Sequence, residues 1–178
     1  MEDRRLIHRC KHGDRDAFRR LYYKYRDLLL KVAVALLRDG HAAEDAVQDV
    51  FVRFAETIGR FQLTGSLKAY LSVCVANRAK TMLISQKKTD PLDEKDATLI
   101  NHFKPEQQII CNEELRLLAK AMERLPFEQR QIIALRHYSR MRIGAIAQSL
   151  ELSPNTVKSR YRYGMNKLRQ LLNDEVTK

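Results

Sequence analysis

The sequence predicts an all-α protein made of two small helical domains joined by a flexible linker. Apolar residues recur at intervals of three and four along most of the 178-residue chain, which is the periodicity of amphipathic helices. Glycine and proline, which interrupt helices, number only 6 and 4. The composition changes at TDPLDEKDATLINHFKPEQQ, where acidic residues gather beside Pro91. We therefore expect domains over residues 1–88 and 113–178, with an acidic linker over residues 89–112.

Three long helices are expected in the first domain. The first begins at Asp14, after Gly13, and ends in the RDG stretch of residues 38–40. The second runs from about residue 42 to 58, and the third from 67 to about 86. The apolar residues expected to face inward are Phe18, Leu21, Tyr22, Tyr25, Leu28, Leu29, Val32, Leu36 and Leu37, then Ala46, Val47, Val50, Phe51, Phe54 and Ile58, then Tyr70, Leu71, Cys74 and, with less periodic support, Met82.

Four helical segments are expected in the second domain, over residues 113–124, 127–137 and 143–150 and from Pro154 onward. Ser153 is a favourable N-cap, and Pro154 occupies the first helical position, where its missing N–H costs nothing. The inward residues of the last helix are Val157, Tyr161, Gly164, Leu168 and Leu171 or Leu172.

The last two segments have the helix-turn-helix arrangement of a short helix, a tight turn and a longer helix. Residues 152–172 carry five basic side chains and no acidic one. Arg can contact guanine, Asn adenine and Ser or Thr either, while Lys neutralises phosphates. A solvated basic helix is the alternative, but the short preceding helix, the turn spacing and the Ser-Pro cap favour DNA. The candidate contacts are Asn155, Thr156, Lys158, Ser159, Arg160 and Arg162.

A formal net charge of +11 and a pI near 9.8 fit a nucleic-acid partner, although an acidic protein or a membrane surface fits the charge equally. No apolar run is long enough to cross a bilayer, and the first residues are too charged for a secretory signal, so we expect a cytoplasmic protein. The 3 cysteines fit reduced thiols. In HRCKH, His8 and His12 share a helical face and Cys10 points away, so we expect neither a metal nor a cofactor.

Several stretches resemble a known family. TVKSRYRYGMNKLR after IAQSLELS is similar to the C-terminal DNA-binding region of bacterial RNA polymerase sigma factors of the extracytoplasmic-function (ECF) group, in the sigma-70 family. MERLPFEQRQIIALRHY resembles the leading helices of that region. HAAEDAVQDVFVRFAETIGRF resembles the core-binding and promoter-melting region, and GSLKAYLSVCVANRA resembles the helix after it. These stretches follow the family's order and span nearly the whole chain.

The resemblance implies a sigma factor without catalytic activity, in which region 2 (residues 1–88) binds core polymerase and the minus-10 element and region 4 (residues 113–178) reads the minus-35 element. The implied partners are promoter DNA, the clamp helices of the largest polymerase subunit, the flap of the second-largest subunit, and an anti-sigma factor. Candidates for the clamp contact are Asp45, Gln48, Asp49 and Arg53. Candidates for the minus-10 contact are Phe61, Gln62, Leu63, Thr64, Gly65 and Ser66, which would capture a flipped base, and Lys68, Asn77, Arg78 and Lys80, which would follow the strand.

Alternatives remain for some of these residues. The clamp candidates also fit a merely solvated face, while Phe51 and Leu63 also fit core contacts. The chain departs from the family pattern at Tyr70, Thr81, Arg142, Ala145 and Glu151. Glu151 replaces a turn glycine, where a positive φ is unfavourable for a residue with a side chain, and its charge repels phosphate.

Two other classes of function compete with a sigma factor. An enzyme would need a catalytic or metal-binding motif, and the five histidines are scattered without a nucleophile partner. A stand-alone helix-turn-helix repressor or activator would bind a palindromic operator as a symmetric dimer, without polymerase.

Overall fold

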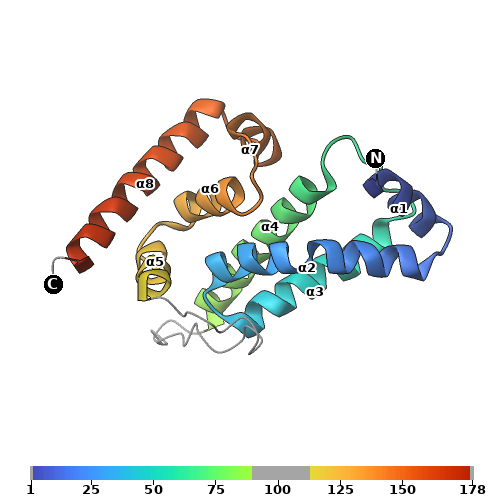
Figure 1. The fold of residues 1–178 in the computed structure, drawn as a ribbon, viewed down its shortest axis with the longest axis horizontal. Coiled ribbons are helices and arrows are strands. Elements are labelled where there is room, and N and C mark those ends of the chain that lie inside the picture. Colours follow the sequence, from blue (N-terminus) through green and yellow to red (C-terminus); the bar gives the residue numbers. More distant parts are fainter. Residues whose placement is uncertain (1, 90–112, 177–178) are drawn as a thin grey trace.

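The computed structural model describes residues 2–89 and 113–176, and every regular element in these ranges is a helix (Figure 1). The helices are α1 (Glu2–Lys11), α2 (Arg15–Leu37), α3 (Gly40–Thr57), α4 (Leu67–Thr89), α5 (Glu113–Glu123), α6 (Phe127–His137), α7 (Ile143–Ser149) and α8 (Pro154–Val176). The predicted all-α fold class is confirmed. The expected acidic linker lies, apart from Thr89, outside the described residues.

Side-chain caps fix the starts of α2 and α3. Asp14 accepts a hydrogen bond from the backbone N–H of Ala17, and Asp39 accepts one from that of Ala42, each at 2.9 Å. The RDG stretch ends α2 as expected, but Arg38 rather than Gly40 adopts the left-handed conformation, with φ 64°. Gly40 instead becomes the first residue of α3, so that helix starts two residues earlier than the sequence suggested.

The apolar stripe of α2 forms the centre of the core. Leu21, Leu29 and Leu36 are fully buried, and α2 packs against α1, α3 and α4. In α4 the expectation for Tyr70 was wrong, because this side chain is 40% exposed. Its ring lies 4.8 Å from the Phe61 ring at the edge of the core. The inward positions of α4 are instead Leu67, Leu71, Val75, Ala76 and Ala79, with Cys74 and Met82 half-buried against them.

The expected inward stripe of α8 is buried, at Val157, Leu168 and Leu171. Gly164 lies against α6, and a Cβ atom at this position would come within 2.8 Å of the Ile133 side chain. The close approach of the two helices therefore favours glycine here, because a larger residue would displace the Ile133 side chain and crowd Gln129.

The two helical units pack against each other through α6, which contacts both α2 and α4. The Ser139 hydroxyl donates to the Ser72 hydroxyl at 2.8 Å, and both side chains are buried. An ion pair between Arg38 and Glu123 adds a second link. One continuous apolar cluster includes Leu36 of α2 and Leu135 of α6. Helical periodicity within each segment did not predict this contact between segments.

This packing also buries a cation. Arg130 on α6 is 6% exposed, and its Nε atom has no hydrogen-bond partner. Burial, reinforced by the charge of Arg38, lowers the pKa of Arg130 to about 10. Its guanidinium lies 5.9 Å from the centre of the Phe127 ring, and within the described residues it makes no ion pair. The desolvation of Arg130 therefore opposes the packing of the two units.

We expect Arg130→Met to increase the free energy of unfolding by about 1–3 kcal/mol, because an apolar side chain of similar length removes the desolvation cost. Guanidinium denaturation followed by circular dichroism measures this change. Arg124→Met, at an exposed position beyond the end of α5, is the matched control and should leave stability nearly unchanged. A loss of stability in Arg130→Met larger than in the control would contradict the expectation.

Candidate nucleic-acid interface

The start of α8 is held by a side-chain cap and a tight turn. The Ser153 hydroxyl accepts a hydrogen bond from the backbone N–H of Thr156 at 3.0 Å, so Ser153 is the N-cap that the sequence predicted. Glu151 adopts φ 55°, the left-handed conformation expected for the glycine that it replaces. At the start of α7, Arg142 occupies the N-cap without a side-chain hydrogen bond.

The N-terminal part of α8 presents its polar residues away from the other helices. Asn155, Lys158 and Arg162 are exposed, and the remaining candidates, Thr156, Ser159 and Arg160, are half-buried. The Ser159 hydroxyl donates to the backbone carbonyl of Thr156 at 3.0 Å. Within the described residues neither Lys158 nor Arg160 makes an ion pair or a side-chain hydrogen bond, so both cations are available to an anionic partner.

The segment between α3 and α4 combines buried and exposed side chains. Phe61 packs edge-on against Phe54 at 5.1 Å and tilts against Tyr70. Leu63 packs against the core, in line with its alternative interpretation. The other residues of the candidate loop are exposed, namely Gln62, Thr64, Gly65 and Ser66.

An ion pair joins the two remaining candidate sites of the first unit. Arg78 on α4 donates from Nε to Asp49 on α3 at 2.7 Å, although the two residues were expected to meet different partners. On α3 the residues Asp45, Gln48 and Arg53 are exposed, while Phe51 is 3% exposed and belongs to the core. On α4 Asn77 and Lys80 are exposed and Lys68 is half-buried.

The HRCKH stretch lies on α1, and its side chains point in the directions that the sequence predicted. The His8 and His12 rings are 4.5 Å apart on the exposed face, and Cys10 is buried. Burial raises the pKa of the Cys10 thiol. Within residues 2–89 and 113–176, no group of three or more His, Cys, Asp or Glu side chains is placed to hold a metal ion. None of the helices described in these ranges has the length and apolarity that a bilayer crossing requires.

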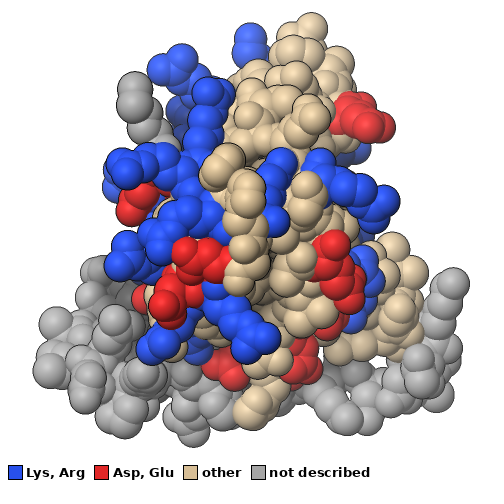
Figure 2. Space-filling model, turned by 90° about the vertical axis from the view of Figure 1, so that its right-hand side faces the viewer, with Lys and Arg blue, Asp and Glu red and all other residues tan. Residues whose placement is uncertain are grey.

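Sequence reasoning missed a basic surface formed by α1 and the first half of α2. Residues 2–31 contain ten Lys and Arg side chains and five Asp and Glu side chains. Figure 2 shows the end of the molecule where α1 lies, with Lys and Arg side chains crowding one half of the face. A charge count over this short range would have revealed the surface, whereas the net charge of the whole chain does not locate it.

We expect Glu151→Gly to increase the free energy of unfolding by about 0.5–1 kcal/mol, because glycine removes the cost of positive φ but adds flexibility to the unfolded chain. Thermal unfolding measures the change. The same substitution at Glu56, an exposed residue of α3, should give no gain, because that residue is helical. Equal effects at the two positions would exclude this explanation.

Two family models match the chain, one over each helical unit. The model for Sigma-70 region 2 matches residues 21–89, and the model for Sigma-70, region 4 matches residues 115–168. Among curated proteins, the RNA polymerase sigma-H factor of Pseudomonas aeruginosa is 25% identical over 169 residues, covering 89% of this chain and 88% of that protein. The ECF RNA polymerase sigma factor SigW of Bacillus subtilis is 24% identical over 181 residues, covering 96% and 97%.

Solved structures of similar fold include CnrH in complex with the cytosolic domain of CnrY, at 21% identity with a TM-score of 0.74, covering 98% of this chain and 99% of that one. The sigma factor RpoE in complex with the anti-sigma factor NepR from Bartonella quintana gives 22% identity and a TM-score of 0.74, covering 88% and 96%. At such identities these structures support the fold. The two region matches and the curated relatives support the family: the chain belongs to the ECF group of the sigma-70 family of RNA polymerase sigma factors.

Proposed function

We propose that this sigma factor directs promoter-specific initiation by dividing its work between the two helical units. The unit α1–α4 binds core RNA polymerase and opens the minus-10 element, and the unit α5–α8 reads the minus-35 element. The observation that supports this proposal is the N-terminal face of α8. This helix begins at a side-chain cap, and it exposes Asn155 and cations that have no counter-ion among the described residues. As a sigma factor, the chain is an initiation factor and not an enzyme.

Recognition of the minus-35 element is assigned to the first turns of α8 in the major groove. Arg160 and Arg162 are suited to bidentate contacts with guanine, and Asn155 to contacts with adenine. Lys158 neutralises a phosphate and carries no base information. Because these contacts release counterions, DNA affinity should fall as salt rises.

Capture of the minus-10 element is assigned to residues 61–66 and the adjacent part of α4. The rings of Phe54, Phe61 and Tyr70 form a cluster at the edge of the core, with Tyr70 partly exposed. Extruding a base costs a few kcal/mol of stacking, and a pocket beside aromatic rings offsets part of that cost. Asn77 and Lys80, both exposed, are placed to follow the strand.

Binding to the polymerase clamp helices is assigned to the polar face of α3. Asp45, Gln48 and Arg53 are exposed on this helix. Of the two candidate carboxylates, Asp49 is already paired with Arg78, whereas Asp45 makes no ion pair within the described residues. Binding to the flap of the second-largest subunit is assigned to the second unit.

We further propose control by an anti-sigma factor and action in the cytoplasm, where polymerase and promoters are found. Two solved relatives of similar fold were determined in complexes, one of them with a named anti-sigma factor. A stand-alone repressor or activator remains the competing function. It would bind a symmetric operator tightly without polymerase, whereas the sigma factor should bind promoter DNA weakly until core enzyme is added.

We expect Arg160→Ala to weaken minus-35 recognition by about 1–3 kcal/mol, or about 5- to 150-fold, through loss of a bidentate base contact. Run-off transcription with purified core polymerase on a promoter library measures both the activity and the preferred sequence. Arg169→Ala removes an exposed cation farther along α8 and should leave the preferred sequence unchanged. Intact promoter choice in Arg160→Ala, together with loss of polymerase binding, would overturn the assignment of the two units.

We expect Asp45→Ala to weaken binding to core polymerase while minus-35 preference is retained. Asp45 makes no ion pair within the described residues, so its removal should not disturb the fold. Asp49→Ala is less suitable as a test, because it also breaks the pair with Arg78. Co-purification with core enzyme measures the effect, with Glu56→Ala, another exposed carboxylate of α3, as control. Equal binding by Asp45→Ala and wild type would remove this residue from the interface.

A further inference from the structure

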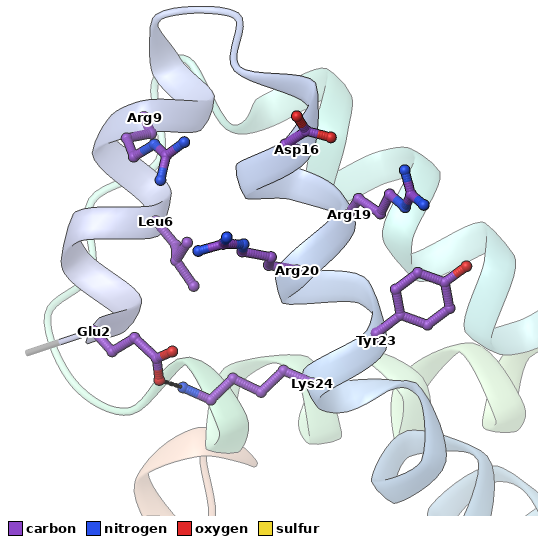
Figure 3. A pocket seen from close by; sticks show the side chains of 8 residues that line it. All are labelled: Glu2, Leu6, Arg9, Asp16, Arg19, Arg20, Tyr23 and Lys24. Carbon is purple, nitrogen blue, oxygen red and sulfur yellow. Dashed lines mark hydrogen bonds and ion pairs between the residues drawn. The ribbon is translucent and has the colours of Figure 1, made fainter.

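Polar side chains link neighbouring helices near the surface of both units. In the first unit, Lys24 of α2 pairs with Glu2 of α1 (Figure 3). In the second unit, the Nε2 atom of His137 on α6 and the hydroxyl of Tyr161 on α8 are joined by a hydrogen bond of 3.0 Å. The first link lies outside the residues assigned to a partner. The second lies within residues 155–162, the stretch of α8 assigned to the minus-35 element.

The contact between His137 and Tyr161 combines a hydrogen bond with ring stacking. The ring centres are 5.9 Å apart and the ring planes differ by 23°. His137 is exposed at the last position of α6, whereas Tyr161 is half-buried and packs against both apolar clusters of the structure. Apolar contacts therefore hold the ring of Tyr161, and His137 holds its hydroxyl.

This hydrogen bond can form in either protonation state of His137. A neutral imidazole that carries its proton on Nδ1 accepts from the Tyr161 hydroxyl, and an imidazolium donates from Nε2 to the same oxygen. The phenolic hydroxyl can act as donor or acceptor, so it matches both forms of the imidazole. The link between α6 and α8 therefore persists when His137 gains or loses a proton.

Tyr161 lies at the point of α8 where support and recognition meet. It stands between Arg160 and Arg162 in the sequence, and its neighbours on the inward side are Val157 and Gly164, both buried. Because an α-helix turns as a rigid rod, any rotation of its inward side moves the outward side by the same angle. A restraint on Tyr161 therefore acts on the direction in which the two arginines point.

Apolar packing alone restrains this rotation weakly. The hydrophobic effect has no preferred direction, so Val157 and its neighbours can stay buried through a small turn of α8. A hydrogen bond requires a short distance and a narrow range of angles, and it is lost when the helix turns. Bidentate contacts between Arg and a base need side chains placed to within about 0.5 Å. The bond to His137 supplies the directional restraint that such contacts need.

We propose that His137 is a positioning residue for minus-35 recognition. It holds the Tyr161 hydroxyl, sets the rotation of the first turns of α8, and so acts on the promoter through Arg160 and Arg162 without touching DNA. This inference rests on the proposed function, because it presupposes that α8 reads the minus-35 element.

The test measures discrimination between promoters, since a bond that only stabilises the fold does not change discrimination by the folded protein. The full chain is combined with core polymerase, and run-off transcription is compared on two templates. One template carries the promoter that the wild type prefers, and the other carries the same promoter with a scrambled minus-35 element. The ratio of the two yields is the discrimination ratio.

Tyr161→Phe keeps the ring and removes the hydroxyl, and His137→Asn removes the bond because its amide reaches only to the place of Nδ1. Each should lower the discrimination ratio about 2- to 12-fold, the effect of one hydrogen bond. His137→Gln carries its amide to the place of Nε2 and should restore the wild-type ratio. The double variant Tyr161→Phe/His137→Asn should lose no more than either single variant, because both changes remove the same bond.

Tyr163→Phe is the matched control. It removes the hydroxyl of a tyrosine that is 57% exposed and makes no side-chain hydrogen bond within the described residues, so the ratio should stay at the wild-type value. Thermal melting shows which variants are folded at the assay temperature. If Tyr161→Phe is unfolded there, the comparison of His137→Asn with His137→Gln, at an exposed position, decides the question.

Three results would overturn the proposal. They are a wild-type ratio in both Tyr161→Phe and His137→Asn, a loss in the double variant equal to the product of the single losses, and a loss in Tyr163→Phe as large as in Tyr161→Phe. A ratio of one for the wild type would refute the proposed function, and this inference with it. A high wild-type ratio that the variants share would refute this inference alone, so the two failures are distinguishable.

Discussion

Burial of the apolar stripe of α2 is the constraint on which the other parts of the structure depend. This helix contacts α1, α3, α4 and α6, so it positions the other helices of the first unit and the start of the second unit at once. Leu21, Leu29 and Leu36 are fully buried along it, and each contributes about 1.5–3 kcal/mol of transfer free energy. The polar functions can lie on the surface because this one helix supplies the shared core.

Polar groups modify the contact between the two units. The buried hydrogen bond between Ser72 and Ser139 satisfies both hydroxyls and joins α4 to the turn after α6. Arg130 acts in the opposite direction, since its desolvated guanidinium has no carboxylate within the described residues. The apolar cluster therefore holds the units together against an electrostatic cost. Such a balance suits a protein whose two ends contact separate promoter elements.

Much of the fold could be predicted from the sequence because caps and periodicity act locally. The Ser153 cap follows from a few neighbouring residues, and the positive φ of Glu151 follows from the turn glycine that it replaces in the family pattern. The pair between Asp49 and Arg78 joins residues 29 positions apart, and local patterns did not reveal it. The prediction that Tyr70 faces inward was wrong, because an aromatic residue at a position that fits the helical periodicity was assumed to be buried. The basic surface of α1 and α2 was not predicted because the net charge of the whole chain does not say where the charges lie.

The packing of α8 at Gly164 bears on which residues of this helix can be replaced to change promoter preference. The missing side chain of this glycine lets α8 approach Ile133, and this contact sets how far the helix protrudes from its support. The seat includes Val157, which lies among the residues assigned to reading DNA, as well as Gly164 and Leu168 beyond them. The two tasks therefore occupy opposite faces of one helix. The outward residues of 155–162 can be exchanged for those of another sigma factor while Val157 and the rest of the anchorage stay the same.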